Sequence, residues 1–158
     1  MKLYEMYLNT SRIPQLVEEK SFRYSSKLRC CDDVVSLLSD CFHIEQLAEE
    51  RVYLIGQDNS GKVCGTFLIS KGTVNASYCQ PREVFQRLFM VGATSFILAH
   101  NHPSGDCTPS ESDTKICHTL RKAGEIMNIY MNDFVIVGAG EYGTNYFSYM
   151  ENGMLREG

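Results

Sequence analysis

The sequence predicts an α/β fold in which a mixed β-sheet is flanked by helices. Segments with strand-like alternation and segments with helical spacing interleave along the 158 residues, and hairpins stand beside crossover connections. The length suits one domain with a short appendage. A content of 44% hydrophobic and 22% charged residues is typical of a globular protein and excludes disorder as the main state.

The N-terminal half is expected to contain one helix and several strands. Apolar residues recur at helical spacing from Asp32 to Leu47, and the acidic pair Asp32-Asp33 suits the positive start of a helix. Two of the strands should form a hairpin around the turn-forming sequence DNSG. The strands predicted here cover residues 2–8, 51–57, 63–70 and 72–79.

The C-terminal half alternates helices and strands. Pro81 is expected to open a helix that runs to about Val91, and Gly92 to close it. A polar loop over residues 100–109 leads to a second helix, which should start at Ser110 and end at Gly124. The strands predicted here cover residues 94–99, 129–137 and 145–150.

The charge balance argues against general nucleic-acid binding. Fifteen basic and nineteen acidic residues give a formal net charge of −4, and the only adjacent basic pair is Arg121-Lys122. A module that binds duplex DNA usually carries a basic stripe, because phosphate neutralisation supplies most of its affinity. Nucleic acid is therefore a disfavoured partner.

The cysteines and the N-terminus favour a cytoplasmic protein. Seven cysteines with no C-x-x-C pair suit reduced thiols better than a disulfide framework. The first residues lack the apolar region of a signal peptide, and the longest apolar runs are too short to span a bilayer. We expect no contact with a membrane.

The segment AHNHPSGDCTPSESD, residues 99–113, carries the chemistry. His100 and His102 are two residues apart at the exit of a strand, so both imidazoles can project to the same side. Asp113 follows early in the next helix, where a turn can bring it to the same point. Two imidazoles and one carboxylate leave a fourth tetrahedral position open for water, as in catalytic zinc sites.

Hydrolysis also needs a base and a donor for the oxyanion. Ser110, one turn before Asp113, is a suitable donor. The base should be a carboxylate, and Glu49 and Glu50 both lie where the first helix gives way to a strand. Strand alternation points these two side chains to opposite faces, and the residues alone do not choose between them.

These residues resemble a known family. His100-x-His102 followed by Ser110-x-x-Asp113 is similar to the JAMM signature of the JAB/MPN metalloproteases. The fuller string HNHPSGDxTPSxxD resembles the form of this signature found in RadC-like proteins. The similarity covers about residues 45–153.

The resemblance implies a JAB/MPN metalloprotease-like fold with one zinc ion per chain, held by His100, His102 and Asp113. It implies that Glu50, by its position relative to the following turn, is the general acid/base and that Ser110 steadies the tetrahedral intermediate. Active JAMM enzymes cut peptide or isopeptide bonds, so the implied partner is a peptide or isopeptide-linked protein substrate. The RadC-like branch is named for DNA repair.

The sequence departs from that family in three respects. RadC-like proteins usually carry an N-terminal helix–hairpin–helix region, for which residues 1–44 are too few. We therefore expect residues 1–44 to be an extension and residues 45–158 to be a stand-alone RadC-like domain. Where the family commonly has Asp-His, this chain has Asp133-Phe134, for which a structural role of Asp133 is expected. Cys107 replaces a frequent proline.

Simpler interpretations compete with the catalytic one. Ser110-x-x-Asp113 also matches a capping box, and Asp106 or Cys107 are rival metal ligands. The pattern Gly138-x-Gly140-x-x-Gly143 is formally a dinucleotide fingerprint, but a β-prone stretch follows it, so a glycine-rich turn is expected.

Three functions are compatible with these residues. A zinc-dependent hydrolase of the JAMM type is the leading hypothesis, followed by a module associated with DNA repair and by a non-catalytic interaction module that keeps the fold. The scissile bond and the oligomeric state are not encoded in any motif of the sequence.

Overall fold

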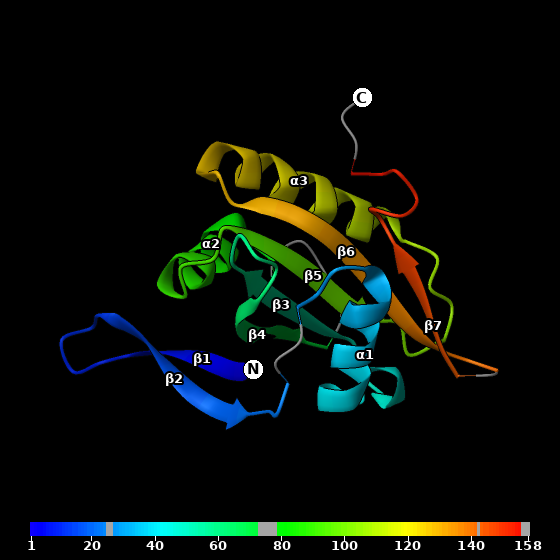
Figure 1. Cartoon of the computed structure of the whole chain (residues 1–158), viewed down its shortest axis with the longest axis horizontal. Helices are drawn as coiled ribbons and strands as arrows, with labels where there is room; N and C mark the ends of the chain where they lie inside the picture. Colours follow the sequence, from blue (N-terminus) through cyan, green and yellow to red (C-terminus); the bar gives the residue numbers. More distant parts are fainter. Residues whose placement is uncertain (25–26, 73–78, 142, 156–158) are drawn as a thin grey trace.

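The computed structural model describes residues 1–24, 27–72, 79–141 and 143–155. Within these ranges seven strands form one mixed sheet in the order β2-β1-β4-β3-β5-β6-β7. The strands are β1 (Lys2–Leu8), β2 (Pro14–Ser21), β3 (Arg51–Gln57), β4 (Val63–Lys71), β5 (Ser95–Asn101), β6 (Tyr130–Gly140) and β7 (Gly143–Ser148). The α-helices are α1 (Cys31–Phe42), α2 (Pro81–Met90) and α3 (Glu111–Met127). The predicted mixed sheet flanked by helices is confirmed (Figure 1).

The centre of the sheet consists of β3 and β5, which are buried over their whole length except for the first residue of each. They pair antiparallel with each other, while β5 pairs parallel with β6. A parallel pair needs a crossover connection, and α3 supplies it. The start of β3, the end of β5 and the start of α3 therefore meet at one end of the sheet.

The two faces of the sheet carry separate apolar cores, because neighbouring residues of a strand point to opposite sides. Ile55 and Ile97 belong to the core that contains α1, whereas Leu54 and Leu98 belong to the core that contains α2 and α3. The molecule thus has three layers, with α1 on one face and the other two helices on the opposite face (Figure 1).

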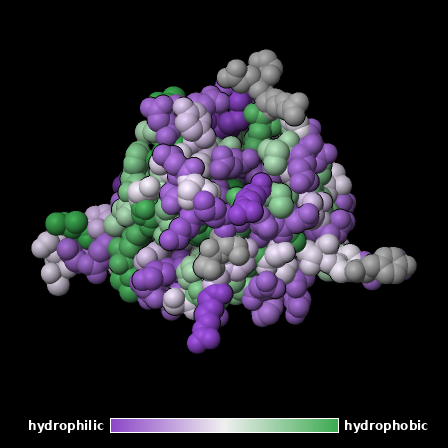
Figure 2. Space-filling view, in the orientation of Figure 1, coloured by the Kyte–Doolittle hydropathy of each residue, from purple (hydrophilic) through white to green (hydrophobic). Residues whose placement is uncertain are grey.

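The N-terminal hairpin of β1 and β2 extends the sheet beyond its core. It contacts β4 through a parallel pairing of Leu3 with Thr66 and projects from the body of the molecule (Figure 1). Hydrophobic residues gather at its tip and over α2 (Figure 2), where Ile13 is 58% exposed and Phe89 is 56% exposed. Charged residues of the edge strand β2, such as Glu18 and Lys20, oppose pairing with another chain.

The first helix is shorter than its apolar spacing predicts. The helix ends at Phe42 because His43 adopts a left-handed conformation with φ of 50°, and its N–H bonds to the carbonyl of Ser39. A 3₁₀ turn over Ile44–Gln46 follows. Ile44 is fully buried in the same core as α1, so the apolar spacing continues although the helix does not.

The prediction that Gly124 ends the helix that follows Ser110 is wrong. This helix, α3, continues to Met127, and Asn128 caps it in a left-handed conformation with φ of 53°. Gly124 lies inside α3 because the chain returns across it there. A Cβ at this position would lie 2.5 Å from the carbonyl oxygen of Ile129, so only glycine allows the contact.

The glycine pattern spans the end of β6 and the start of β7, which form an antiparallel hairpin and not a dinucleotide site. Residues Gly140 and Gly143 pair with each other where β6 turns into β7, and β7 follows where a dinucleotide site would need a helix. Gly138 serves a different contact, since a Cβ there would lie 2.6 Å from the carbonyl oxygen of Gly105. The loop after β5 is thereby held against β6.

The strand predicted over residues 72–79 falls largely outside the described residues. Among the helices that the structure describes, none combines the length and the apolar character needed to cross a membrane.

Candidate metal centre

Two histidines and an aspartate converge at the end of the sheet where β5 stops and α3 starts. His100 is the penultimate residue of β5, His102 follows the strand directly, and Asp113 lies in the first turn of α3. One potential ligand atom of each residue lies within 4.8 Å of the others. The predicted convergence of the three side chains is therefore present in the fold.

The two imidazoles face the same carboxylate. Nε2 of His100 lies 3.2 Å from Oδ1 of Asp113, and Nε2 of His102 lies 3.6 Å from Oδ2. The two rings are 4.8 Å apart, at an angle of 72°. This is a compact set of two nitrogen donors and one oxygen donor, of the types that zinc prefers.

The loop after β5 fixes the tautomer of His102. Nδ1 of His102 lies 2.7 Å from the backbone carbonyl oxygen of Asp106, and a carbonyl can only accept a hydrogen bond. In a neutral ring Nδ1 therefore carries the proton, and Nε2, which faces Asp113, has the lone pair that binds a metal. Metal-binding histidines are commonly oriented in this way.

His100 supports the fit of a cation to this site. Its side chain is fully buried; within the described residues Nδ1 has no hydrogen-bond partner, and Nε2 faces the Asp113 carboxylate at 3.2 Å without the alignment of a hydrogen bond. Buried polar atoms are rarely left without a partner. A cation held by Nε2 would supply one, and the donor set of His100, His102 and Asp113 suits zinc.

Asp113 is held as a carboxylate anion. Its burial works to raise its pKa, but the His100 imidazole and the donors of Ser110 outweigh burial and lower the pKa to about 2. The hydroxyl of Ser110 donates to Oδ2 at 2.6 Å, and the backbone N–H of Ser110 donates to the same oxygen at 2.8 Å. A negative charge on Asp113 at neutral pH is what a metal ligand requires.

The capping box at the start of α3 is confirmed. The backbone N–H of Asp113 donates to the hydroxyl oxygen of Ser110, and the Asp113 carboxylate accepts from the backbone of Ser110. The structural and the functional interpretations of these two residues therefore coexist. The single hydroxyl proton of Ser110 is engaged by Asp113, so donation to an oxyanion requires the hydroxyl to rotate.

The structure separates the two candidate bases. Glu50 lines the same hollow as the three candidate ligands. This hollow has a volume of about 310 Å³ and is also bordered by Pro103, Ser104 and Ser110. Glu49 forms an ion pair with Lys71 at 3.1 Å instead. Only Glu50 of this pair faces the site.

Asn101 is part of this site, although no sequence motif singled it out. Its buried amide group donates to the carbonyl oxygens of Leu47 at 3.3 Å and Glu49 at 3.2 Å. Its side-chain oxygen accepts from the N–H of Arg51 at 2.8 Å. Asn101 thus fixes the backbone on both sides of Glu50. A polar residue between two histidines at the end of an otherwise apolar strand was the available signal.

The two rival ligands lie outside the cluster. The exposed carboxylate of Asp106 accepts a hydrogen bond from the N–H of Thr108 at 2.9 Å. Bonds from Thr108 lower the pKa of this carboxyl, with a smaller contribution from His102. The thiol of Cys107 is buried, and burial raises its pKa. Within the described ranges, His100, His102 and Asp113 are the only group of three with this spacing.

The pair Asp133-Phe134 supports the site from β6. The Asp133 carboxylate accepts hydrogen bonds from the N–H groups of Phe134 and Met150 and from the hydroxyl of Ser148. It therefore anchors the end of β7, which agrees with the structural role expected for it. The ring of Phe134 packs against the imidazole of His100, with 5.4 Å between the ring centres.

A mixed sheet with two histidines and one aspartate at this position defines a JAB-type fold with a candidate metal centre. The family model described as "RadC-like JAB domain" matches residues 28–154. The chain belongs to this family.

Several relatives are UPF0758 proteins. One from Pelobacter propionicus is 40% identical over 118 residues, covering 73% of this chain and 50% of the relative. One from Chlorobium chlorochromatii is 36% identical over 82% of this chain and 55% of the relative. One from Thermotoga maritima is 37% identical over 78% of this chain and 54% of the relative. The chain thus spans about half the length of these curated relatives.

Proposed function

We propose that this protein is a zinc-dependent hydrolase of the JAMM type that cuts peptide or isopeptide bonds. The observation that carries the proposal is the position of Glu50, which borders the same hollow as His100, His102 and Asp113. A carboxylate beside an open three-ligand site is the arrangement that metal-assisted hydrolysis requires.

Bound zinc would polarise the scissile carbonyl and make water acidic enough to attack near neutral pH. Glu50 accepts the proton of the attacking water and delivers it to the leaving amine. Ser110 turns its hydroxyl from Asp113 toward the developing oxyanion. Asn101 holds the backbone around Glu50, so the carboxylate is in place before substrate arrives.

A peptide is the proposed partner in preference to nucleic acid. The net charge of −4 disfavours broad contact with phosphates. The proposed location is the cytoplasm, because all seven cysteines are free thiols.

Exchange of Glu50 for glutamine tests the proposal. Purified protein should contain one zinc ion per chain and should cleave members of a panel of quenched peptide and isopeptide-linked substrates. Glu50→Gln should lower the cleavage rate by about 100-fold or more, because acid–base groups typically contribute that much. Its zinc content, measured by mass spectrometry, should stay the same, since Glu50 is assigned to water and not to the metal.

The neighbouring glutamate provides the control. Glu49→Gln removes the same charge but breaks only an exposed ion pair with Lys71, so its rate should lie within about twofold of the wild type. Equal losses in both variants, or cleavage that persists in a His100→Ala, His102→Ala double variant, would contradict the proposal. A further outcome is that the wild type binds zinc and still cleaves no substrate of the panel. If the inactive Glu50→Gln variant then also captures no substrate protein from a cell extract, the protein is a non-catalytic module.

A further inference from the structure

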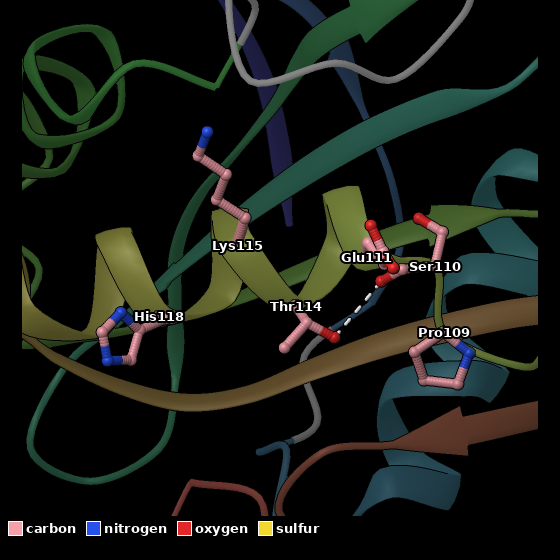
Figure 3. A pocket seen from close by; sticks show the side chains of 6 residues that line it. All are labelled: Pro109, Ser110, Glu111, Thr114, Lys115 and His118. Carbon is pink, nitrogen blue, oxygen red and sulfur yellow. Dashed lines mark hydrogen bonds between the residues drawn. The ribbon is translucent and has the colours of Figure 1, made fainter.

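Two hollows continue the metal centre along the exposed flank of α3. The first, of about 490 Å³, starts at Ser110, which also borders the metal hollow. Figure 3 shows that side chains from the first two turns of α3 line it, down to His118. The second, of about 420 Å³, shares Thr114 and His118 with the first and reaches the C-terminal turn at Tyr149. The three hollows are neighbours that share lining residues, and we name the two hollows beside α3 the α3 groove.

The charged side chains in the far part of the α3 groove are basic. Among the residues that the structure describes, no acidic one lines the second hollow, whose lining residues are Thr114, Cys117, His118, Arg121, Lys122, Tyr149 and Met154. Lys115 adds a further cation in the first hollow, where Glu111 is the only acidic residue among the described lining residues and lies at the metal end. The surface around α3 is largely hydrophilic in Figure 2.

These cations are available for a partner. Arg121 pairs with Glu125 at 3.0 Å, but Lys115 and Lys122 form no ion pair within the part of the chain that the structure describes. The chain as a whole is acidic, with a net charge of −4. A cluster of cations on such a molecule is a local feature that attracts anions by short-range steering.

We propose that the α3 groove binds an acidic segment of the protein substrate, on one side of the scissile bond. This inference rests on the proposed hydrolase function and adds the class of substrate. The rise from Ser110 to Arg121 is about 17 Å at 1.5 Å per residue of helix. An extended peptide covers that distance in about five residues. Acidic side chains about three to five positions from the scissile bond therefore meet Lys115, Arg121 and Lys122.

The charge distribution favours a peptide over nucleic acid. The cations lie along a single helix, and Glu111 and Glu125 flank them. A phosphate backbone would need cations on a wider surface, since its affinity grows with the number of neutralised phosphates. A single extended chain with a few carboxylates matches this arrangement of cations.

Peptide binding to the zinc-free protein tests this inference without any cleavage. The probes are fluorescent ten-residue peptides rich in glutamate, in glutamine or in lysine, and a single-stranded DNA of ten nucleotides, read by fluorescence anisotropy at low salt. The glutamate peptide should bind at least about tenfold more tightly than the glutamine peptide, and 0.5 M salt should remove the difference because exposed charges are screened. A Lys115→Glu, Lys122→Glu double variant should lose about tenfold in affinity for the glutamate peptide.

Lys62→Glu is the matched control at the opposite end of the sheet, in the turn between β3 and β4. It is made both alone and together with Lys20→Glu, so that the double control carries the same net charge as the test variant. The control should bind the glutamate peptide within about twofold of the wild type.

Equal losses of affinity in the test and control variants, or equal binding of the three peptides, would overturn the inference. Tighter binding of DNA than of the glutamate peptide, lost in the test variant alone, would assign the groove to nucleic acid instead. Because no bond is cleaved, an inactive enzyme leaves this result unaffected.

Discussion

The amide of Asn101 is the residue-scale feature that links the ligands to the proposed base. It lies between His100 and His102 in sequence and bonds to the backbone of Leu47, Glu49 and Arg51. Three hydrogen bonds from one buried side chain fix the position of a segment that is distant in sequence. The ligands and Glu50 therefore share one rigid support.

Asn101→Asp should uncouple the base from the metal centre. A carboxylate at this position would face the carbonyl oxygens of Leu47 and Glu49 without protons to donate, so the segment around Glu50 would shift. A displacement of about 1 Å costs up to about 100-fold in rate. We expect kcat to fall by about 10- to 100-fold while KM and zinc content remain unchanged. Loss of zinc in parallel with activity would contradict the positioning role.

Asp133 makes a pH-dependent contribution to stability. Burial raises its pKa, against the hydrogen bonds from Ser148, Met150 and Phe134 that lower it. A raised pKa in the folded state means that the native protein holds this proton more tightly than the unfolded chain does. Its contribution to stability is therefore full below the unfolded pKa and declines as the pH rises through the folded pKa.

Asp133→Asn should remove that decline, since an amide does not titrate. Urea unfolding between pH 4 and 7 should show the free energy of unfolding of the wild type falling relative to that of the variant as the pH rises. The asparagine oxygen can still accept from the N–H groups of Phe134 and Met150, so the variant should fold. If the difference in the free energy of unfolding between wild type and variant does not change with pH, Asp133 titrates with an ordinary pKa.

At the scale of elements, the hairpin of β3 and β4 and the strand β5 could be predicted because local signals agree there. Alternation, apolar runs and turn residues indicate the same elements there, although β5 continues through His100 and Asn101, which were expected to start the loop. The end of α1 could not be predicted, because Ile44 continues the apolar spacing although His43 has left the helical conformation. The end of α3 was predicted wrongly for a related reason. Gly124 is needed there because the backbone of Ile129, from the following segment, packs against it, and not because the helix ends.

Gly124→Ala in α3 should destabilise the protein, contrary to the usual effect of this exchange in helices. Alanine is favoured over glycine by about 1 kcal/mol inside a helix, but the new Cβ would lie 2.5 Å from the carbonyl oxygen of Ile129. Overpacking of this kind costs about 1–3 kcal/mol. Chemical denaturation should thus show a lower free energy of unfolding.

A comparison within the same helix isolates the cause of that loss. Thr119 is exposed on α3, and Thr119→Ala should raise stability by a few tenths of a kcal/mol through helix propensity alone. Stabilisation of the Gly124→Ala variant to a similar extent would show that the backbone of Ile129 can move away.

At the scale of the whole molecule, the convergence of the three candidate ligands could be predicted from spacing, but the contacts that support them could not. His100, His102 and Asp113 are close in sequence, and the strand and helix between which they lie have clear signals. The choice of Glu50 over Glu49 depends on Lys71 at the far end of β4. The contacts of Asn101 span about fifty residues, a separation over which local patterns carry no information.

Zinc should stabilise the whole fold, because its proposed ligands lie at the end of β5 and the start of α3. At a free zinc concentration 100 times the dissociation constant, binding adds about 2.7 kcal/mol to the free energy of unfolding. For a chain of this size this corresponds to a rise of about 5–10 °C in Tm. The His100→Ala, His102→Ala double variant should show no such rise in calorimetry, and an equal rise in that variant would place the zinc elsewhere.

The capping box has a consequence for the order in which the site assembles. Ser110 and Asp113 begin α3, and their hydrogen bonds also orient the carboxylate whose two oxygens face the two imidazoles. Fraying of that first helical turn would carry the carboxylate away from β5, and loading of the cation would suppress the fraying. Protection of the first amides of α3 against solvent exchange should therefore rise with metal occupancy, so helix nucleation and metal uptake form one thermodynamic event.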